Sequence, residues 1–202
     1  MILFIRSSNY HIDGRLSRYL NIFKGKLDSG VLYWDRKNEN AKNDNFRFYF
    51  PSSYGNGLRS IIGFVLWNFY ILFFLIKNRK AITCVHAINL DTIIPVLIAK
   101  PIIKGKVVYD IYDCYADSHS IGGLMNYFVK RVERLCCSLS DTIILPDESR
   151  IKQSLLENSD FDIMIIENVP AIDCINLKEE LHAEVRKIKF IYAGNLQKKY
   201  EG

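Results

Sequence analysis

The sequence predicts an α/β protein with a mostly parallel sheet and helices on both faces. Short apolar runs alternate along the chain with longer segments of helical periodicity, as in proteins built from strand, helix and strand units. The 202 residues are 49% hydrophobic and 24% charged, which suits a globular chain and not a disordered one. This length allows one full domain of about 100 to 200 residues, or one domain with part of a second.

Six short apolar runs are the expected strands. They are residues 2–5, 31–34, 82–85, 107–111, 142–145 and 163–166. Most of these runs are continuously apolar and do not alternate with polar residues, which is typical of parallel strands covered by helices on both faces. The runs therefore predict a largely parallel sheet whose helices lie in the connecting segments.

Helical periodicity is clearest between residues 124 and 139. Apolar residues recur there with a period near 3.6 and charged residues occupy the positions between them, so we expect an amphipathic helix packed on the sheet. Its apolar stripe consists of Leu124, Phe128, Val132, Leu135 and Leu139. A shorter helix is expected over residues 148–156, with Asp147 as a candidate cap.

Residues 61–76 are the most apolar segment of the chain. Only Gly63 and Asn68 interrupt it, and basic residues flank it on both sides. At about 1.5 Å per residue the segment covers roughly 24 Å, which is short of the roughly 30 Å hydrocarbon core of a bilayer. A membrane span stays open as an alternative. Because a strand pattern resumes directly afterwards, we expect a helix packed on the sheet, in a domain that rests on a membrane surface.

Basic residues concentrate in the first part of the chain. Residues 1–80 contain 13 Lys and Arg against 5 Asp and Glu, whereas residues 81–202 contain 14 against 17. The excess is either a set of solvated side chains or a surface that faces an anionic partner, such as lipid headgroups or a phosphate-bearing substrate. Nucleic acid is not expected as a partner, because the basic residues are dispersed and no nucleic-acid-binding motif accompanies them.

Missing motifs exclude several classes of protein. Five cysteines form an odd set without CxxC spacing and no signal peptide is evident, so a reducing cytoplasm is favoured and structural zinc is not expected. A dinucleotide-binding enzyme needs G-x-G-x-x-G after its first strand, yet residues 7–15 contain a single glycine. The P-loop pattern G-x-x-x-x-G-K-S/T is also absent from the sequence.

Several residue patterns together resemble a known family. Residues 84–91 (CVHAINLD), 93–100 and 106–113 (KVVYDIYD) form a strand, helix and strand pattern whose strands end near a His and near a Tyr-Asp pair. Further motifs are Asp-Gly-Arg at 13–15, Leu-Ser-Asp at 139–141 before an Ile pair, and Glu-Asn-Val-Pro at 167–170. The set resembles the N-terminal domain of family 4 glycosyltransferases, which are retaining enzymes with the GT-B fold, a Rossmann-like sheet in each half.

The resemblance assigns roles to five residues. It implies that His86, Tyr112 and Asp113 are catalytic and that Asp13 and Arg15 bind the acceptor. All five are expected just past strand ends, where ligands bind in open α/β sheets, so one shared cleft is expected. Tyr112 stands where relatives typically have a His.

Each of these roles has a plainer alternative. His86 is equally compatible with a hydrogen-bonded histidine of the core. Arg15 is either a surface arginine or a phosphate ligand in the first strand-to-helix loop. Asp110 is expected to cap or anchor a turn.

The resemblance also divides the chain into three parts. Residues 1–170 are the expected N-terminal domain, 171–189 a connector and 190–202 the first strand of a donor-binding domain, with Gly194 as part of the donor site. The nucleotide pocket that the family places further on has no counterpart in the sequence, so the chain alone is expected to be inactive. No cofactor and no metal are expected, because the nucleotide sugar is a substrate and family 4 enzymes are metal-independent as a rule.

The expected function is therefore that of a glycosyltransferase domain in bacterial surface-glycan biosynthesis, such as O-antigen or capsule. Its expected partners are a nucleotide sugar bound by the absent domain, a lipid-diphosphate-linked or polysaccharide acceptor and an anionic membrane surface. The expected location is the inner face of the cytoplasmic membrane. Two alternatives stay open: a membrane-associated interaction protein without catalysis, and another Rossmann-type nucleotide-binding enzyme.

Overall fold

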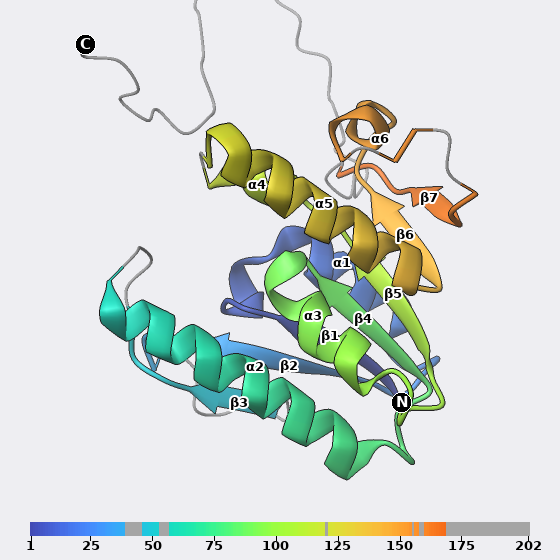
Figure 1. The fold of residues 1–202 in the computed structure, drawn as a ribbon. Helices are drawn as coiled ribbons and strands as arrows, with labels where there is room; N and C mark the ends of the chain where they lie inside the picture. Colours follow the sequence, from blue (N-terminus) through green and yellow to red (C-terminus); the bar gives the residue numbers. More distant parts are fainter. Residues whose placement is uncertain (39–45, 53–56, 120, 155, 158–159, 169–202) are drawn as a thin grey trace, which may run out of the picture. The chain divides into compact units, whose positions relative to one another are not determined.

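A seven-stranded, all-parallel sheet organises residues 1–38, 46–52, 57–119, 121–154, 156–157 and 160–168, the part of the chain that the computed structural model describes (Figure 1). The chain divides into two compact units, Met1–Ala171 and Ile172–Gly202, and every described residue belongs to the first. The strands are β1 (Ile2–Arg6), β2 (Ser29–Asp35), β3 (Phe46–Tyr49), β4 (Cys84–Ile88), β5 (Lys106–Asp110), β6 (Thr142–Leu145) and β7 (Ile163–Ile165). The predicted fold class is confirmed.

The strand order β3-β2-β1-β4-β5-β6-β7 places a switch point between β1 and β4. The chain moves outwards from β1 to β3, then returns to add β4 on the other side of β1. In register, Phe4 of β1 pairs with Val31 of β2 and with His86 of β4. Open α/β sheets form a ligand crevice at such a switch point, outside the carboxyl ends of the strands.

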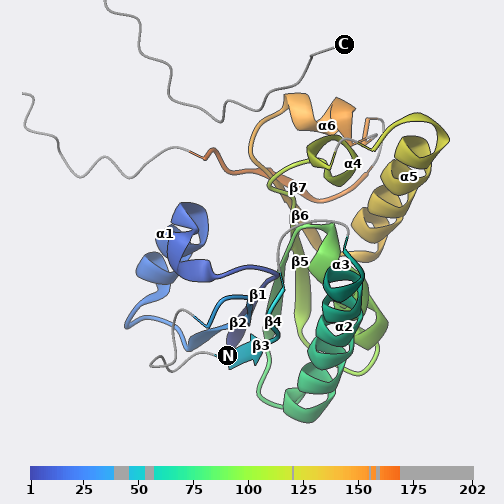
Figure 2. The same ribbon diagram turned by 90° about the vertical axis from the view of Figure 1, so that its left-hand side faces the viewer.

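Helices cover both faces of the sheet. Helices α2, α3 and α5 lie on one face, and α1 lies on the other (Figure 2). The helices are α1 (Gly14–Phe23), α2 (Leu58–Asn78), α3 (Leu90–Ala99), α4 (Tyr115–Ser118), α5 (Gly123–Leu139) and α6 (Ser149–Gln153), with a short 3₁₀ helix η1 (Tyr10–Ile12) before α1. The side chain of Asp147 accepts a hydrogen bond from the backbone N–H of Ser149 at 2.8 Å, at the start of α6.

The core has two parts because successive strand residues point to opposite faces. Leu3 and Ile5 of β1 belong to the larger cluster beneath α2, α3 and α5, together with Trp67. Phe4 belongs to the smaller cluster beneath α1, together with Leu16. Both faces of β1 are therefore buried, which explains why its sequence is continuously apolar.

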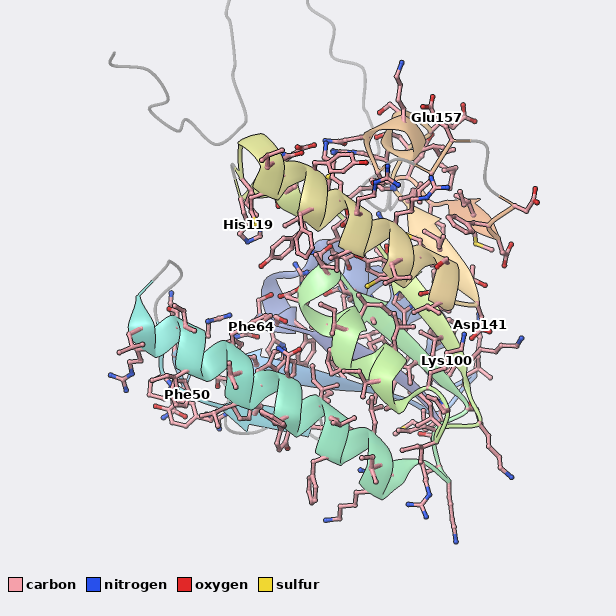
Figure 3. The ribbon with its side chains drawn as sticks, viewed as in Figure 1. Phe50, Phe64, Lys100, His119, Asp141 and Glu157 are labelled. Carbon is pink, nitrogen blue, oxygen red and sulfur yellow. The ribbon has the colours of Figure 1, made fainter. Side chains whose placement is uncertain are left out.

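Helix α2 is part of the core layer on one side only. Trp67 is fully buried, and its Nε1 donates a hydrogen bond to Ser7 Oγ at 2.8 Å. Gly63 lies so close to the sheet side that a Cβ there would come within 2.7 Å of Phe50 and of Trp34 (Phe50 is marked in Figure 3). Within the described residues α2 is the one helix long and apolar enough to cross a membrane, and 22% of its most apolar 18-residue window is buried.

Two strands differ most from the sequence prediction. The run predicted at residues 82–85 starts and ends too early, because β4 continues through His86 to Ile88. Strand β3 was not expected: it is a four-residue edge strand that contains Arg47, which lies 2.9 Å from Asp35 of β2. A charged residue interrupts the run of apolar residues by which a strand is recognised in a sequence, and for this reason the short edge strand β3 was not predicted.

Of the five residues in the predicted buried stripe of α5, Val132 packs against the core and the other four do not. Leu124 is 90% exposed, and Phe128, Leu135 and Leu139 are also exposed. The face toward the sheet carries Glu133, Cys136 and Cys137 as its buried residues. Buried cysteines act as small apolar residues. The hydroxyl of the sheet residue Tyr109 donates a hydrogen bond to Glu133 at 3.3 Å, so this carboxyl has a partner in the core. For these two reasons the less apolar face of α5 can pack against the sheet.

Candidate functional site

A cavity of about 960 Å³ opens at the carboxyl ends of the strands around the switch point. Segments from seven parts of the chain form its wall: the end of β1, the start of α1, the start of α2, and residues that follow β2, β4, β5 and β7. Phe64 of α2 and His119 after α4 line it and are marked in Figure 3. The wall consists of Arg6, Ser7, Ser8, Asp13, Gly14, Arg15, Arg36, Ser60, Ile61, Phe64, Asn89, Asp91, Tyr112, Tyr115, His119 and Asn168.

Asp13 joins three parts of this wall. Its Oδ1 accepts the backbone N–H of Leu16 at 3.0 Å and so caps α1. The same oxygen accepts a hydrogen bond from the hydroxyl of Tyr112 at 3.3 Å, and Oδ2 lies 2.9 Å from Arg6 Nε. The predicted site residues Asp13 and Tyr112 are thus in direct contact, and Arg6, which the sequence prediction did not include, is their third member.

Tyr112 lies between two guanidinium groups. The Cζ atoms of Arg6 and Arg15 are 4.8 and 4.9 Å from the centre of its ring. Burial, reinforced by the nearby carboxylate of Asp13, raises the pKa of Tyr112 above its ordinary value. The phenol therefore stays protonated near neutral pH and acts as a hydrogen-bond donor, not as a base.

Asp110, the last residue of β5, forms the centre of a buried network. Its Oδ1 lies 2.9 Å from Arg15 Nη2, and its Oδ2 lies 2.8 Å from His86 Nε2. The Tyr19 hydroxyl donates to Oδ2 at 3.1 Å; burial and then the charge of Asp110 raise the pKa of Tyr19 to about 12, so this donor keeps its proton. Two hydrogen bonds, from His86 and Tyr19, and one ion pair with Arg15 compensate this buried carboxylate for its loss of hydration.

His86 does not line the cavity. It lies inside β4, not past its end, and its side chain points to the α1 face of the sheet like its register partner Phe4. Its ring centre is 4.8 Å from that of Phe4 and 5.1 Å from that of Tyr19. The expectation that His86 shares the cleft with the other four residues is therefore wrong, and its contact with the site runs through Asp110.

Arg15 is the second residue of α1 and is 3% exposed. Its guanidinium lies between the rings of Tyr112 and Tyr19, and its Nε donates to the Tyr19 hydroxyl at 3.1 Å. Among the described residues its Nη1 has no hydrogen-bond partner. A buried donor left unpaired costs about 1–3 kcal/mol, so an anion in the cavity would complete this group.

A second cavity of about 340 Å³ adjoins the first. Arg15, Tyr112 and Asn168 line both cavities, and Asp113 and Arg150 line only this one. Asp113 Oδ1 lies 3.4 Å from Arg150 Nη2. Asp113 is therefore next to Arg15 and Tyr112 as predicted, but on the far side of them from the larger cavity.

Asn168 and Asn89 also line the larger cavity, although the sequence analysis did not name either as a site residue. Asn168 belongs to the Glu-Asn-Val-Pro motif, and its Oδ1 accepts a hydrogen bond from Arg18 of α1 at 2.6 Å. Asn89 has φ +66° and ψ 169°, a region that side chains other than glycine rarely occupy and that costs of the order of 1–3 kcal/mol. Its Oδ1 accepts the backbone N–H of Tyr112 at 3.0 Å, which fixes the start of that loop.

The charges in the wall of the larger cavity are mixed. Arg6, Arg15 and Arg36 face Asp13 and Asp91. Burial raises the pKa of Asp91, although a hydrogen bond from Ser7 and the charge of Arg6 oppose the shift. The three arginines outnumber the two aspartates, which favours an anionic ligand over a cationic one.

Within the described ranges no group of three or more His, Cys, Asp or Glu side chains is arranged to hold a metal ion. Gly194, the expected donor-site residue, lies outside the described residues. The same holds for the expected connector 171–189 and the expected strand in 190–202.

Solved structures resemble this chain, whereas no protein-family model and no curated protein matches its sequence. The UDP-GlcNAc 2-epimerase of Methanocaldococcus jannaschii is 14% identical, with a TM-score of 0.53 over 82% of this chain and 45% of that one. Anabaena Alr3699/HepE, in complex with UDP and glucose, is 13% identical, with a TM-score of 0.52 over 83% of this chain and 44% of that one. The chain has a GT-B-like fold.

The GT-B-like fold matches the predicted architecture. The chain spans somewhat less than half the length of these two proteins.

Proposed function

We propose that this chain is the acceptor-side domain of a GT-B glycosyltransferase similar to family 4. The enzyme transfers a sugar from a nucleotide-sugar donor to a lipid-diphosphate-linked or polysaccharide acceptor in the synthesis of a bacterial surface glycan. The observation that carries the proposal is the convergence of Arg6, Arg15 and Tyr112 in one cavity at the switch point of the sheet.

The chemistry of this wall suits a phosphate group of the acceptor. The cavity meets the N-terminus of α1, where helix backbone N–H groups and the helix dipole favour negative charge. Arg6 offsets the charge of Asp13, the carboxylate that would otherwise oppose an anion there. Asp110 holds Arg15 in place, and the free Nη1 of Arg15 supplies a directed donor.

One side of the same wall is apolar. Ile61 and Phe64, from the first turns of α2, line the cavity together with the arginines. A ligand with a charged head and an apolar tail can thus satisfy both sides, whereas a fully polar sugar would leave the α2 side in contact with its hydroxyls. This mixed wall favours a lipid-linked acceptor within the two acceptor classes.

The residues then divide into two groups. Tyr112, Arg6 and Arg15 contact the acceptor and orient it, which is where much of the rate of group transfer originates. His86 and Tyr19 act at one remove, because they hold Asp110, which in turn holds Arg15. The nucleotide sugar is bound by another domain, and neither a cofactor nor a metal takes part in this half.

Calorimetry with the 202-residue chain tests the proposal. Farnesyl diphosphate, as an amphiphilic diphosphate, should bind at micromolar concentration, and UDP-glucose should not bind at millimolar concentration. Arg6→Gln should weaken farnesyl diphosphate binding at least about tenfold through loss of a charge-assisted contact. The matched control Arg131→Gln, on the exposed face of α5, should bind as the unchanged protein does.

The opposite pattern would overturn the proposal. Micromolar binding of UDP-glucose, with no binding of farnesyl diphosphate, would indicate a self-contained nucleotide-binding enzyme. Equal loss of affinity in Arg6→Gln and Arg131→Gln would show that the diphosphate binds to basic surface charge and not to the cavity.

A further inference from the structure

The outward face of the α2, α3 and α5 layer is apolar on all three helices. On α2 the exposed apolar side chains lie opposite the core residue Trp67, and on α5 they lie opposite the buried Glu133. The views in Figures 1 and 2 place the three helices side by side on one face of the sheet. The exposed residues are Ile61, Ile62, Val65, Leu66, Phe69 and Phe73 of α2, Ile94 and Ile98 of α3, and Leu124, Phe128, Leu135 and Leu139 of α5.

This surface, which we call the helix-layer face, is more apolar than a solvated surface needs to be. Single exposed apolar residues are ordinary in soluble proteins, but a contiguous group of this kind marks an interaction site. Helix α2 has the composition of a membrane segment, with a mean hydropathy of 1.9. It is nevertheless anchored in the fold by Trp67, Ile71 and Leu75, which are fully buried. A helix with one face in the protein core cannot be surrounded by lipid, so it can only lie on a surface.

The charges of the three helices indicate which partner fits. Helix α2 contains no acidic residue, Asp91 of α3 lines the cavity, and Glu133 of α5 is fully buried. The basic residues Arg59, Lys77 and Arg131 are exposed, and Arg79 and Lys80 follow directly after α2. Exposed apolar side chains flanked by basic ones and free of exposed acids complement an anionic lipid surface.

We propose that the helix-layer face rests on an anionic membrane, with the aromatic and aliphatic side chains of α2, α3 and α5 inserted at the level of the headgroups. In this orientation Ile61 and Phe64 place the mouth of the cavity beside the lipid, since they begin the same helix that contacts it. The inference goes beyond the proposed function, because it holds whether or not the protein transfers a sugar.

Vesicle flotation of the 202-residue chain tests the inference. The protein should float with vesicles of phosphatidylcholine and phosphatidylglycerol in equal amounts, and much less with phosphatidylcholine alone. The double substitution Phe69→Ser and Phe73→Ser removes two side chains that are 66% and 63% exposed, and should reduce binding by at least about tenfold. Neither side chain belongs to the core, so circular dichroism should show an unchanged fold.

A matched control is available on the other face of the sheet. Ile22 of α1 and Leu27 after it are 57% and 53% exposed, and the double substitution Ile22→Ser and Leu27→Ser should leave flotation unchanged. A second variant, Lys77→Gln with Arg79→Gln and Lys80→Gln, should reduce binding to the anionic vesicles only.

Three outcomes would overturn the inference. The first is failure of the chain to float with anionic vesicles, and the second is an equal reduction of flotation by the two double substitutions. The third is a dimer, seen by sedimentation, that Phe69→Ser with Phe73→Ser dissociates, because the face would then be covered by a second copy of the chain. The assay contains neither sugar nor nucleotide, so its result is independent of the calorimetry above.

Discussion

The carboxylate of Asp110 lies 2.9 Å from the guanidinium of Arg15, and both side chains are almost completely buried. The pair connects the end of β5 to the first turn of α1. Asp110→Asn removes the negative charge and leaves the Arg15 guanidinium buried without a counterion. Removing one partner of a buried pair typically costs about 3–5 kcal/mol, so we expect a loss of this size in the free energy of unfolding, measured in urea.

A matched control for this substitution is Asp113→Asn. Asp113 is 60% exposed on its side chain and lies 3.4 Å from Arg150, so its loss should cost no more than about 1 kcal/mol. Equal effects of the two substitutions would show that the Asp110 network does not hold the fold as described.

Strand prediction from the sequence succeeded where burial on both faces makes the pattern strong. The run at 142–145 coincides with β6, and the run at 2–5 lies within β1. The α/β pattern predicted a mostly parallel sheet but not the order of its strands, because strand pairing depends on contacts between residues far apart in the sequence. The unexpected strand β3, which contains Arg47, and the later position of β4 show where strand prediction from composition fails. Hydrogen bonds to the neighbouring strands decide where a strand begins and ends.

The site was predicted less completely than the fold. Asp13, Arg15 and Tyr112 follow strand ends or begin a helix, so position in the chain was sufficient to place them together. The position of His86 was predicted wrongly because β4 continues to Ile88. His86 therefore lies within the strand, and its side chain points to the α1 face of the sheet. Asp110 was expected to anchor a turn because a single carboxylate has no recognisable sequence pattern. Its partners, the hydrogen-bonded His86 and Tyr19 and the ion-paired Arg15, come from β4 and α1, far away in the sequence.

The neutral phenol of Tyr112 leads to a prediction about pH. Its pKa is raised by burial and by Asp13, so ionisation begins only above the ordinary value of 10. Tyr112→Phe removes the hydrogen bond that the hydroxyl donates to Asp13 in the cavity wall. It should weaken farnesyl diphosphate binding by about tenfold or less, and by the same factor at pH 6 and at pH 9. Calorimetry at the two pH values measures the ratio. A ratio that shrinks toward pH 9 would mean that the phenol ionises in that range.

Glu133 gives a prediction about stability and pH. Burial raises its pKa, although hydrogen bonds from the Tyr115 backbone, Cys114 and Tyr109 oppose the shift. The folded protein therefore keeps a proton that the unfolded chain has lost, and stability falls as pH rises from the ordinary glutamate value through the raised one. Glu133→Gln keeps the shape without the charge. Its melting temperature should exceed that of the unchanged protein at pH 7 by about 2–4 °C.

The gain from Glu133→Gln should be smaller at pH 4.5, where protonation already neutralises the carboxyl in the folded protein. Glu157→Gln is the control, because Glu157 is exposed (Figure 3) and its substitution should change neither value. A larger gain at pH 4.5 than at pH 7 would contradict a raised pKa for Glu133.

The contact between α2 and the sheet gives the last prediction. Gly63→Ala places a Cβ at 2.7 Å from Phe50 and from Trp34, closer than carbon atoms approach, and Trp34 is fully buried and cannot move aside. Overpacking of this kind costs about 1–3 kcal/mol, so thermal unfolding should shift down by several degrees. At Gly14, in the first turn of α1, no atom lies within 4 Å of an added Cβ, and Gly14→Ala should leave the melting temperature unchanged or slightly raised. If Gly63→Ala proved as stable as Gly14→Ala, α2 would have to lie further from β2 and β3 than described, and the argument that its inner face belongs to the core would fail with it.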